Sequence, residues 1–323
     1  MESSERAWQN GSLMILPLAK HFLKRFVFCL VLGALAFAGC KDREGPAIPT
    51  SRNHVTIGVL PNEAKRDLGL LQKELEKRLG LTVRVWVPKD YSDLVDGFKR
   101  GEVDFAFFTA LLFLQAEREA GAKALLKKVY GRSEFYYSAV ITRADSKIRR
   151  LQDLKGKKIG FVDPKSTSGF LYPRVLLRAA GLDASPGRAA SVTVLESKFF
   201  GTHAANVQAL LDGQIDAAGV WANEEGTERG SWTDKPFTES DARKIRVLKL
   251  SDPIPNDAFA VRGSLYTENP MLVLRVMEAL ISMGEETNGA LKKVIDADKM
   301  ATATSRHYDS VRAIESLLKE DPK

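Results

Sequence analysis

The sequence predicts an α/β protein of two lobes with a ligand cleft between them. Short β-branched segments alternate with amphipathic helical segments along most of the chain, which is typical of α/β folds. The chain has 323 residues, of which 44% are hydrophobic, and this length suits two domains of ordinary size. The alternation restarts at Leu151, and segments after about residue 245 fit a return to the first lobe. We therefore place the first lobe at 54–142 plus 248–323 and the second lobe at 143–247.

The first lobe is predicted from a strand–helix–strand pattern that begins at His54. The segment 54–60 (HVTIGVL) is β-branched and stops at Pro61. Leucines mostly three and four residues apart predict a helix over 64–79, which Gly80 ends. The following elements are expected to be strand 81–87, helix 91–100, strand 103–108, helix 111–119, and strands 124–130 and 135–142.

The second lobe is predicted from the same alternation, giving each lobe a largely parallel sheet. After it, two strands are expected to return to the first lobe, and Pro270 opens a long closing helix. The expected elements are strand 157–162, helix 167–180, strand 192–195, helix 204–212 and strand 215–220, then strands 245–250 and 258–262 and helix 272–283.

The N-terminal segment is predicted to be an export signal. Three basic residues precede an uncharged run at 26–38, whose 13 residues are too few to span about 30 Å of hydrocarbon comfortably. The run ends in small residues before Cys40, which resembles a bacterial lipoprotein signal. We therefore expect a signal peptide over 1–39, lipid on Cys40, and a tether over 40–53. A simple membrane anchor or an ordinary signal peptide are the alternatives, and Met14 is an alternative start to Met1.

Charge and cysteine content exclude several function classes. The net charge is +7, but 48 basic residues are spread among 41 acidic ones, and export separates the chain from nucleic acid. Two cysteines cannot form a disulfide framework or a cysteine-rich metal site. Outside the signal, the histidines at 54, 203 and 307 are far apart. We expect no metal and no cofactor, and only His203 near Asp216 offers a candidate catalytic pairing.

Three hydroxyl residues lie where the strand at 157–162 gives way to a helix. Ser166, Thr167 and Ser168, here called the Ser-Thr-Ser segment, are followed by Gly169. The N–H groups of a helix N-terminus lack partners and favour negative charge, and each hydroxyl can donate a further hydrogen bond. The segment therefore indicates an anion site. Plain N-capping is the alternative, although one capping residue is enough for a helix.

Five stretches of the chain carry a resemblance to a known family. They are TIGVLPNE (56–63), DYSDLVDGFKRGEVDFAFF (90–108), DLKGKKIGFVDPKSTSGFLYPR (153–174), FFGTHAANVQALLDGQIDAAGVW (199–221) and IPNDAFAVR (254–262). Together they resemble the periplasmic phosphonate- and phosphite-binding proteins of ABC importers, and the resemblance covers 54–320. The resemblance implies a type II periplasmic-binding-protein fold whose lobes close over a tetrahedral oxyanion. It also implies an ABC permease and its ATPase as partners.

The resemblance also assigns roles to particular residues. It implies that the Ser-Thr-Ser hydroxyls cradle the phosphonate and that a ring N–H of His203 donates to it. Tyr91 and either Tyr136 or Tyr137 match the tyrosines of the first lobe that donate hydroxyls and wall the site. Thr109, at a strand end, is expected to add a hydroxyl and neighbouring backbone N–H groups.

Recognition of the organic substituent is left open by the sequence. Relatives that bind aminoalkylphosphonates need carboxylates that face the ammonium group. The candidates here are Asp257 and Glu224, with Asn223 at the position that best matches the acid of those relatives. Phosphite, phosphate, methylphosphonate and aminoethylphosphonate all remain candidate ligands.

The sequence as a whole predicts a lipid-anchored, monomeric binding protein on the periplasmic or cell-surface face of the membrane. It would deliver a phosphonate-like oxyanion to an ABC permease. Two alternatives remain at this point: a lipoprotein that senses the same ligand for a signalling system, and an enzyme on the same fold.

Overall fold

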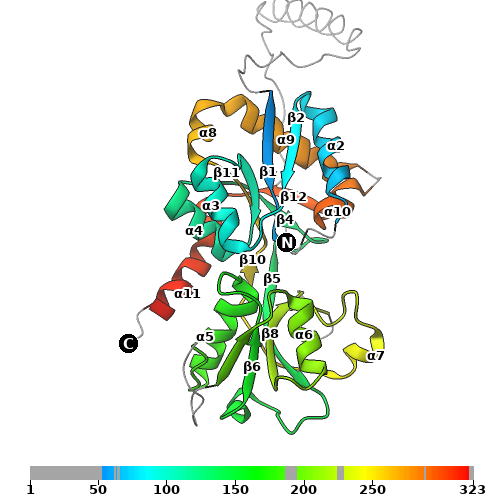
Figure 1. Ribbon diagram of the computed structural model, residues 1–323, viewed down its shortest axis with the longest axis vertical. Coiled ribbons are helices and arrows are strands. Elements are labelled where there is room, and N and C mark those ends of the chain that lie inside the picture. The colour runs from blue at the N-terminus through cyan, green and yellow to red at the C-terminus, as the bar shows by residue number, and fades with distance from the viewer. Residues whose placement is uncertain are drawn as a thin grey trace, which may run out of the picture. The chain divides into compact units, whose positions relative to one another are not determined.

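The computed structural model describes residues 53–61, 63, 66–185, 195–223, 229–286 and 289–319 (Figure 1). All of them belong to one compact unit, Thr50–Lys323, which is separate from the unit Met1–Pro49. The predicted signal peptide, Cys40, Glu224 and most of the predicted strand 192–195 lie outside the described residues.

One mixed sheet forms the first lobe, with strand order β12-β4-β11-β3-β1-β2. β1 pairs in parallel with β2 and β3, whereas β11 runs antiparallel to both β3 and β4, and β12 runs antiparallel to β4. The strands are β1 His54–Gly58, β2 Thr82–Trp86, β3 Phe105–Phe108, β4 Lys123–Val129, β11 Ala258–Val261 and β12 Lys299–Thr302.

A second mixed sheet forms the other lobe, with order β10-β5-β8-β6-β7 and β9 paired to β5. β6 is parallel to β7 and β8, and β5 is antiparallel to its partners β8, β9 and β10. The strands are β5 Phe135–Arg143, β6 Lys158–Phe161, β7 Glu196–Phe199, β8 Ala217–Ala222, β9 Ile245–Leu250 and β10 Ile254–Pro255.

α3 and α4 begin and end where side-chain caps and glycines predict. Asp90 and Thr109 cap α3 and α4, and the two helices end at Gly101 and Gly121 in the left-handed conformation (φ 75° and 63°). The longer helices are α2 Leu68–Leu79, α3 Tyr91–Arg100, α4 Ala110–Ala120, α5 Tyr172–Ala179, α6 His203–Leu211, α9 Pro270–Glu285 and α11 Asp309–Lys319. The shorter ones are η2 Leu151–Leu154, η3 Thr167–Leu171, α7 Glu239–Ala242, α8 Gly263–Glu268, α10 Ala290–Ile295 and η4 Ser305–Tyr308.

Two strands belong to a different lobe from the one that the sequence predicted. β5 was expected in the first lobe and β9 was expected to return to it, but both lie in the second sheet, where they pair with each other. The expectation of largely parallel sheets was also wrong, because both sheets are mixed. The two connections between lobes therefore run between β4 and β5 and between β10 and β11, so the first lobe ends near 134 and resumes near 256.

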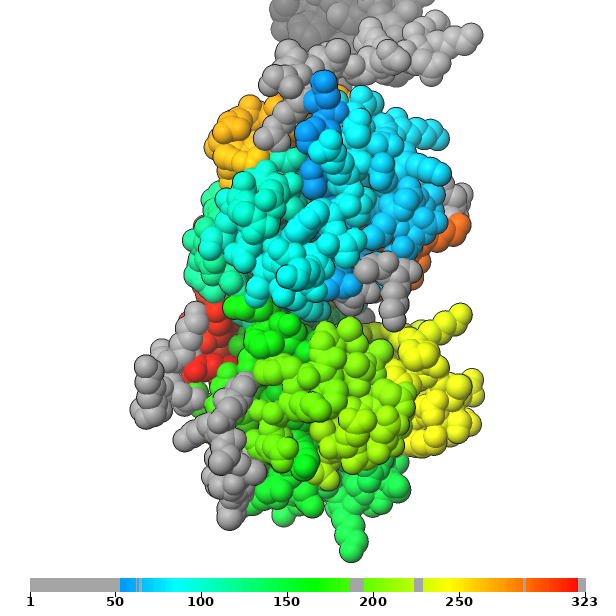
Figure 2. Space-filling model, in the orientation of Figure 1, coloured from blue at the N-terminus to red at the C-terminus, as the bar shows by residue number. Residues whose placement is uncertain are grey.

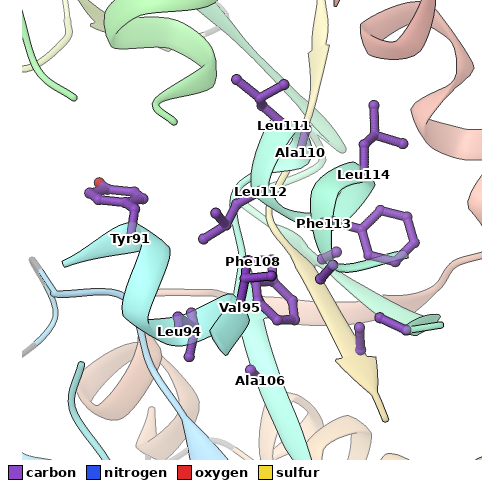
Figure 3. Packing of buried hydrophobic residues seen from close by; sticks show 14 of the residues in the cluster. Tyr91, Leu94, Val95, Ala106, Phe108, Ala110, Leu111, Leu112, Phe113 and Leu114 are labelled. Carbon is purple, nitrogen blue, oxygen red and sulfur yellow. The ribbon is translucent and has the colours of Figure 1, made fainter. Parts of the chain in front are cut away.

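The lobes share a buried apolar contact. The hydrophobic cluster around α3, β3 and α4, shown in Figure 3, also contains Leu171 and Tyr172 from the second lobe and Tyr308 and Val311 near the C-terminus. On the face drawn in Figure 2, the second lobe (green) lies directly against the first (cyan). Arg178 of α5 also donates from Nη1 to the Leu317 carbonyl at 2.7 Å. Among the helices of the described ranges, none combines the length and apolar character needed to cross a membrane.

Candidate functional site

Two helix N-termini, one from each lobe, meet at the Ser-Thr-Ser segment. The N–H of Leu111, in the first turn of α4, donates to Thr167 Oγ1 at 2.9 Å. Thr109 caps the same helix by accepting from Leu112 N at 3.3 Å, and its hydroxyl lies 3.5 Å from the Lys165 carbonyl. Because a hydroxyl that accepts one hydrogen bond still has a proton to donate, Thr167 can connect α4 to a bound anion.

The Ser-Thr-Ser segment is held by hydrogen bonds to its own backbone and to β5. Ser166 Oγ accepts from Gly169 N at 3.0 Å and so caps η3, a π-helical turn that continues into α5. Ser138 Oγ, in β5, donates to the Ser168 carbonyl at 2.7 Å. All three hydroxyl residues are buried, and Thr167 is fully inaccessible. These hydrogen bonds hold the backbone that carries the three hydroxyls in one position, which favours precise contacts with a small anion.

Tyr136 lies beside these hydroxyls, and Tyr137 does not. Burial raises the pKa of Tyr136 well above its ordinary value, and the charge of Asp257 raises it further, while hydrogen bonds with Ser168 and Thr167 oppose the shift. Adjacent strand residues point to opposite faces. Tyr137 accordingly packs against a separate hydrophobic cluster of the second lobe, which includes Trp232. Of the two tyrosines left open by the sequence, the geometry brings Tyr136 to the segment.

Tyr91 is a buried phenol at the start of α3 (Figure 3). Burial raises its pKa, and the negative charges of Asp257, Asp163 and Glu63 raise it further. Tyr91 belongs to the apolar cluster that also contains Leu171 and Tyr172, which follow the Ser-Thr-Ser segment in the chain. Tyr91 and Tyr136 both remain protonated at neutral pH, and each can therefore donate a hydrogen bond.

His203 is a neutral imidazole at the start of α6. Its Nδ1 accepts from Trp221 N at 3.3 Å, so the ring proton is on Nε2. Burial lowers the pKa of His203 to about 3. The loop before α6 runs beside the end of β6, because Gly201 N donates to the Val162 carbonyl at 2.8 Å. His203 and the Ser-Thr-Ser segment therefore follow neighbouring parallel strands and lie at the same edge of the sheet.

The residues expected to contact the organic substituent of the ligand do not all lie beside the Ser-Thr-Ser segment. Asp257 Oδ2 lies 3.4 Å from Lys128 Nζ, and burial raises the pKa of Asp257, although Lys128 opposes the shift. Asn223 has a buried Oδ1 without a hydrogen-bond partner among the described residues. No described contact joins Asn223 to the Ser-Thr-Ser segment, and Glu224 lies outside the described residues.

Two charged residues near the site were missed by sequence reasoning. Lys128 and Glu63 form a buried ion pair, with Nζ 2.6 Å from Oε1. The available signal was a pair of lysines inside an otherwise apolar strand, since lysine is almost never fully buried without a partner. The partner itself could not be read locally, because it lies 65 residues away.

Two lobes whose helix N-termini meet at a turn rich in hydroxyls are typical of solute-binding proteins. Residues 57–308 match the family described as ABC transporter, phosphonate, periplasmic substrate-binding protein. The chain belongs to this family, whose members are extracytoplasmic components of ABC importers, and it has their solute-binding role. The family and role expected from the sequence are thereby confirmed.

Similar proteins agree with this assignment. The phosphate-import protein PhnD of Mycolicibacterium smegmatis is 29% identical over 314 residues, which cover 92% of this chain and 95% of the relative. The phosphonates-binding periplasmic protein of Escherichia coli is 27% identical over 223 residues, 65% of this chain and 61% of the relative. The structure of PhnD1 from Prochlorococcus marinus with methylphosphonate has a TM-score of 0.69 at 17% identity, over 83% and 99% of the two chains. The expected type II periplasmic-binding-protein fold is confirmed.

Proposed function

We propose that this chain is a lipid-anchored, monomeric binding protein that holds a phosphorus oxyanion between its lobes and delivers it to an ABC permease. The observation that carries the proposal is the meeting of the Ser-Thr-Ser turn with the N-terminus of α4, through Thr167 and the N–H of Leu111. Two helix N-termini and several hydroxyls directed at one point favour a small anion. The relatives described above are named for phosphate and phosphonates or were solved with methylphosphonate, which supports the same ligand class.

Each donor has a role in this proposal. Ser166, Thr167 and Ser168 surround the oxyanion from the second lobe, and His203 donates from Nε2. Tyr136, Tyr91 and Thr109 complete the site, with Thr109 held 3.5 Å from the Lys165 carbonyl of the second lobe.

The proposed donors are hydroxyl, phenol, imidazole and backbone N–H groups, none of which carries a charge. Hydrogen bonds to a charged acceptor are shorter and stronger than bonds between neutral groups, so such a site can bind tightly. It can also discriminate by the shape and protonation state of the anion, because a misplaced oxygen leaves a buried donor unpaired.

A ligand panel tests the proposed function. The full-length chain, purified in a mild detergent, is heated with phosphate, phosphite, methylphosphonate, ethylphosphonate or sulfate. A ligand present at about 100 times its Kd stabilises the native state by about 2.7 kcal/mol, which is readily seen as a rise in Tm. We expect this rise with at least one phosphorus oxyanion and not with sulfate. A panel in which no phosphorus oxyanion raises the Tm contradicts the proposal.

Lipid attachment at Cys40 is tested by a matched pair of cysteine substitutions. In bacterial cells that express the chain, Cys40→Ser is expected to abolish incorporation of labelled palmitate and to release the chain from the washed membrane fraction. Cys29→Ser alters the other cysteine, which lies within the predicted signal, and is expected to change neither property. Continued labelling of the Cys40→Ser chain overturns the assignment.

A further inference from the structure

A buried lysine lies between two carboxylates beside the proposed site. Lys128 Nζ is 2.6 Å from Glu63 Oε1 and 3.4 Å from Asp257 Oδ2. The three side chains, here called the buried ion cluster, are 1%, 5% and 18% exposed. A lysine so fully removed from water keeps its charge only through such partners.

The buried ion cluster borders the tyrosines of the site. The charge of Asp257 acts on both Tyr91 and Tyr136, and that of Glu63 acts on Tyr91. Tyr136 pairs with Ile254, three residues before Asp257, in the ladder between β5 and β10. Asp257 directly precedes Ala258, which pairs with Phe108 next to Thr109, so the cluster lies on the first-lobe side of the proposed site.

Lys128 is fixed in place by the first sheet. Its backbone N–H donates to the Asp257 carbonyl at 3.1 Å, and its own carbonyl accepts from Asn256 Nδ2 at 3.1 Å. Its ammonium lies 5.4 Å from the centre of the Phe107 ring. The ammonium therefore cannot leave Asp257 for solvent without disrupting buried contacts.

The carboxylates of the cluster are already balanced by cations. Arg66 Nε lies 3.5 Å from Glu63 Oε2, so that each carboxylate of the cluster faces a cationic side chain. Arg66 is shared with Asp296, which also lies 3.3 Å from Lys292, and Lys292 in turn lies 3.4 Å from Asp298. A further ammonium brought by a ligand would lie beside that of Lys128, and like charges at such a distance in a buried site repel strongly.

We infer that Lys128 is a specificity-determining residue, because its ammonium occupies the position at Asp257 that a cationic substituent of the ligand would take. The site then accepts phosphorus oxyanions that carry hydrogen or an uncharged substituent and rejects aminoalkylphosphonates. This inference rests on the proposed function and names its substrate class more narrowly.

Ethylphosphonate and 2-aminoethylphosphonate test the inference, since they differ only by the ammonium group. Calorimetric titration of the full-length chain in detergent is expected to give a Kd for ethylphosphonate at least tenfold lower than the Kd for 2-aminoethylphosphonate. The side chain of Lys128→Met has a similar length but no charge. In this variant the affinity for 2-aminoethylphosphonate is expected to rise at least tenfold relative to the affinity for ethylphosphonate. In Lys128→Met with Asp257→Asn, which lacks both charges, that gain is expected to disappear.

Asp257→Asn alone keeps the test decisive if Lys128→Met does not fold. The inference expects this variant to discriminate between the two ligands as the parent does, because Asp257 is already occupied by Lys128. A specific tenfold loss of 2-aminoethylphosphonate binding in Asp257→Asn overturns the inference, as does a parent chain that binds 2-aminoethylphosphonate at least as tightly as ethylphosphonate. Failure of the parent chain to bind any phosphorus oxyanion is a different result, which overturns the proposed function itself.

Discussion

Replacement of Thr167 and Ser168 by alanine together is expected to weaken oxyanion binding at least about a hundredfold. Each substitution removes a hydroxyl donor, and a hydrogen bond to a charged group contributes about 1.5–3 kcal/mol, so two of them account for at least that factor. Calorimetric titration with the best ligand of the panel measures the change in Kd. Circular dichroism is expected to show a folded chain, because the backbone contact of Ser168 with Ser138 is kept.

The matched control for this double variant is Thr167→Ser. It keeps an oxygen that can accept from Leu111 N and a proton that can be donated to the ligand. Its Kd is expected to stay within a few-fold of the parent value. A folded double variant with unchanged affinity would show that the Ser-Thr-Ser segment does not bind the ligand and only caps its helix.

His203→Asn is expected to weaken oxyanion binding about tenfold or more without loss of the local backbone contact. The amide oxygen of asparagine can replace Nδ1 as the acceptor for Trp221 N, but the donor on Nε2 is lost. His203→Gln, which places an N–H near the former Nε2, is the contrasting variant and is expected to lose less affinity. Equal Kd values for all three chains would show that His203 does not touch the ligand.

The same residue predicts how stability depends on pH. The pKa of His203 is lowered by burial to about 3 in the folded chain, against about 6.5 for an unfolded histidine. Below pH 6.5 the unfolded state takes up a proton that the folded state refuses, so the free energy of unfolding falls as the pH drops towards 3. Urea denaturation at pH 7.5 and 4.5 should show a smaller decrease in His203→Asn than in the parent chain. An identical decrease in both chains contradicts a neutral imidazole in the folded state.

Local sequence signals were enough to place most elements of the fold. The helix Tyr91–Arg100 and the strand Ile245–Leu250 have the bounds that the sequence predicts, because capping residues and β-branched runs act within a few residues. Lobe membership was not predictable in this way. β5 is an apolar run that could pair with either sheet, and its pairing with β8 and β9 depends on partners about 80 to 110 residues away.

In the candidate site, too, features made by neighbouring residues could be predicted from the sequence, and features made by distant residues could not. The Ser-Thr-Ser turn was found because its residues are consecutive and precede a helix. The choice between Tyr136 and Tyr137 required the orientation of β5 within its sheet, which sequence alternation alone does not supply. Lys128 required its distant partner Glu63, so only the folded chain shows that Asp257 has a cation beside it.

The sharing of one apolar cluster by both lobes has a consequence for how the protein denatures. Leu171 and Tyr172 belong to the helical segment that begins within the Ser-Thr-Ser segment, yet they are buried with the core of the first lobe and with Tyr308. Loss of order in the first lobe would expose this apolar surface and remove the support of the segment at once. We therefore expect the two lobes to unfold as one cooperative unit, with tertiary structure and ligand binding lost in the same transition.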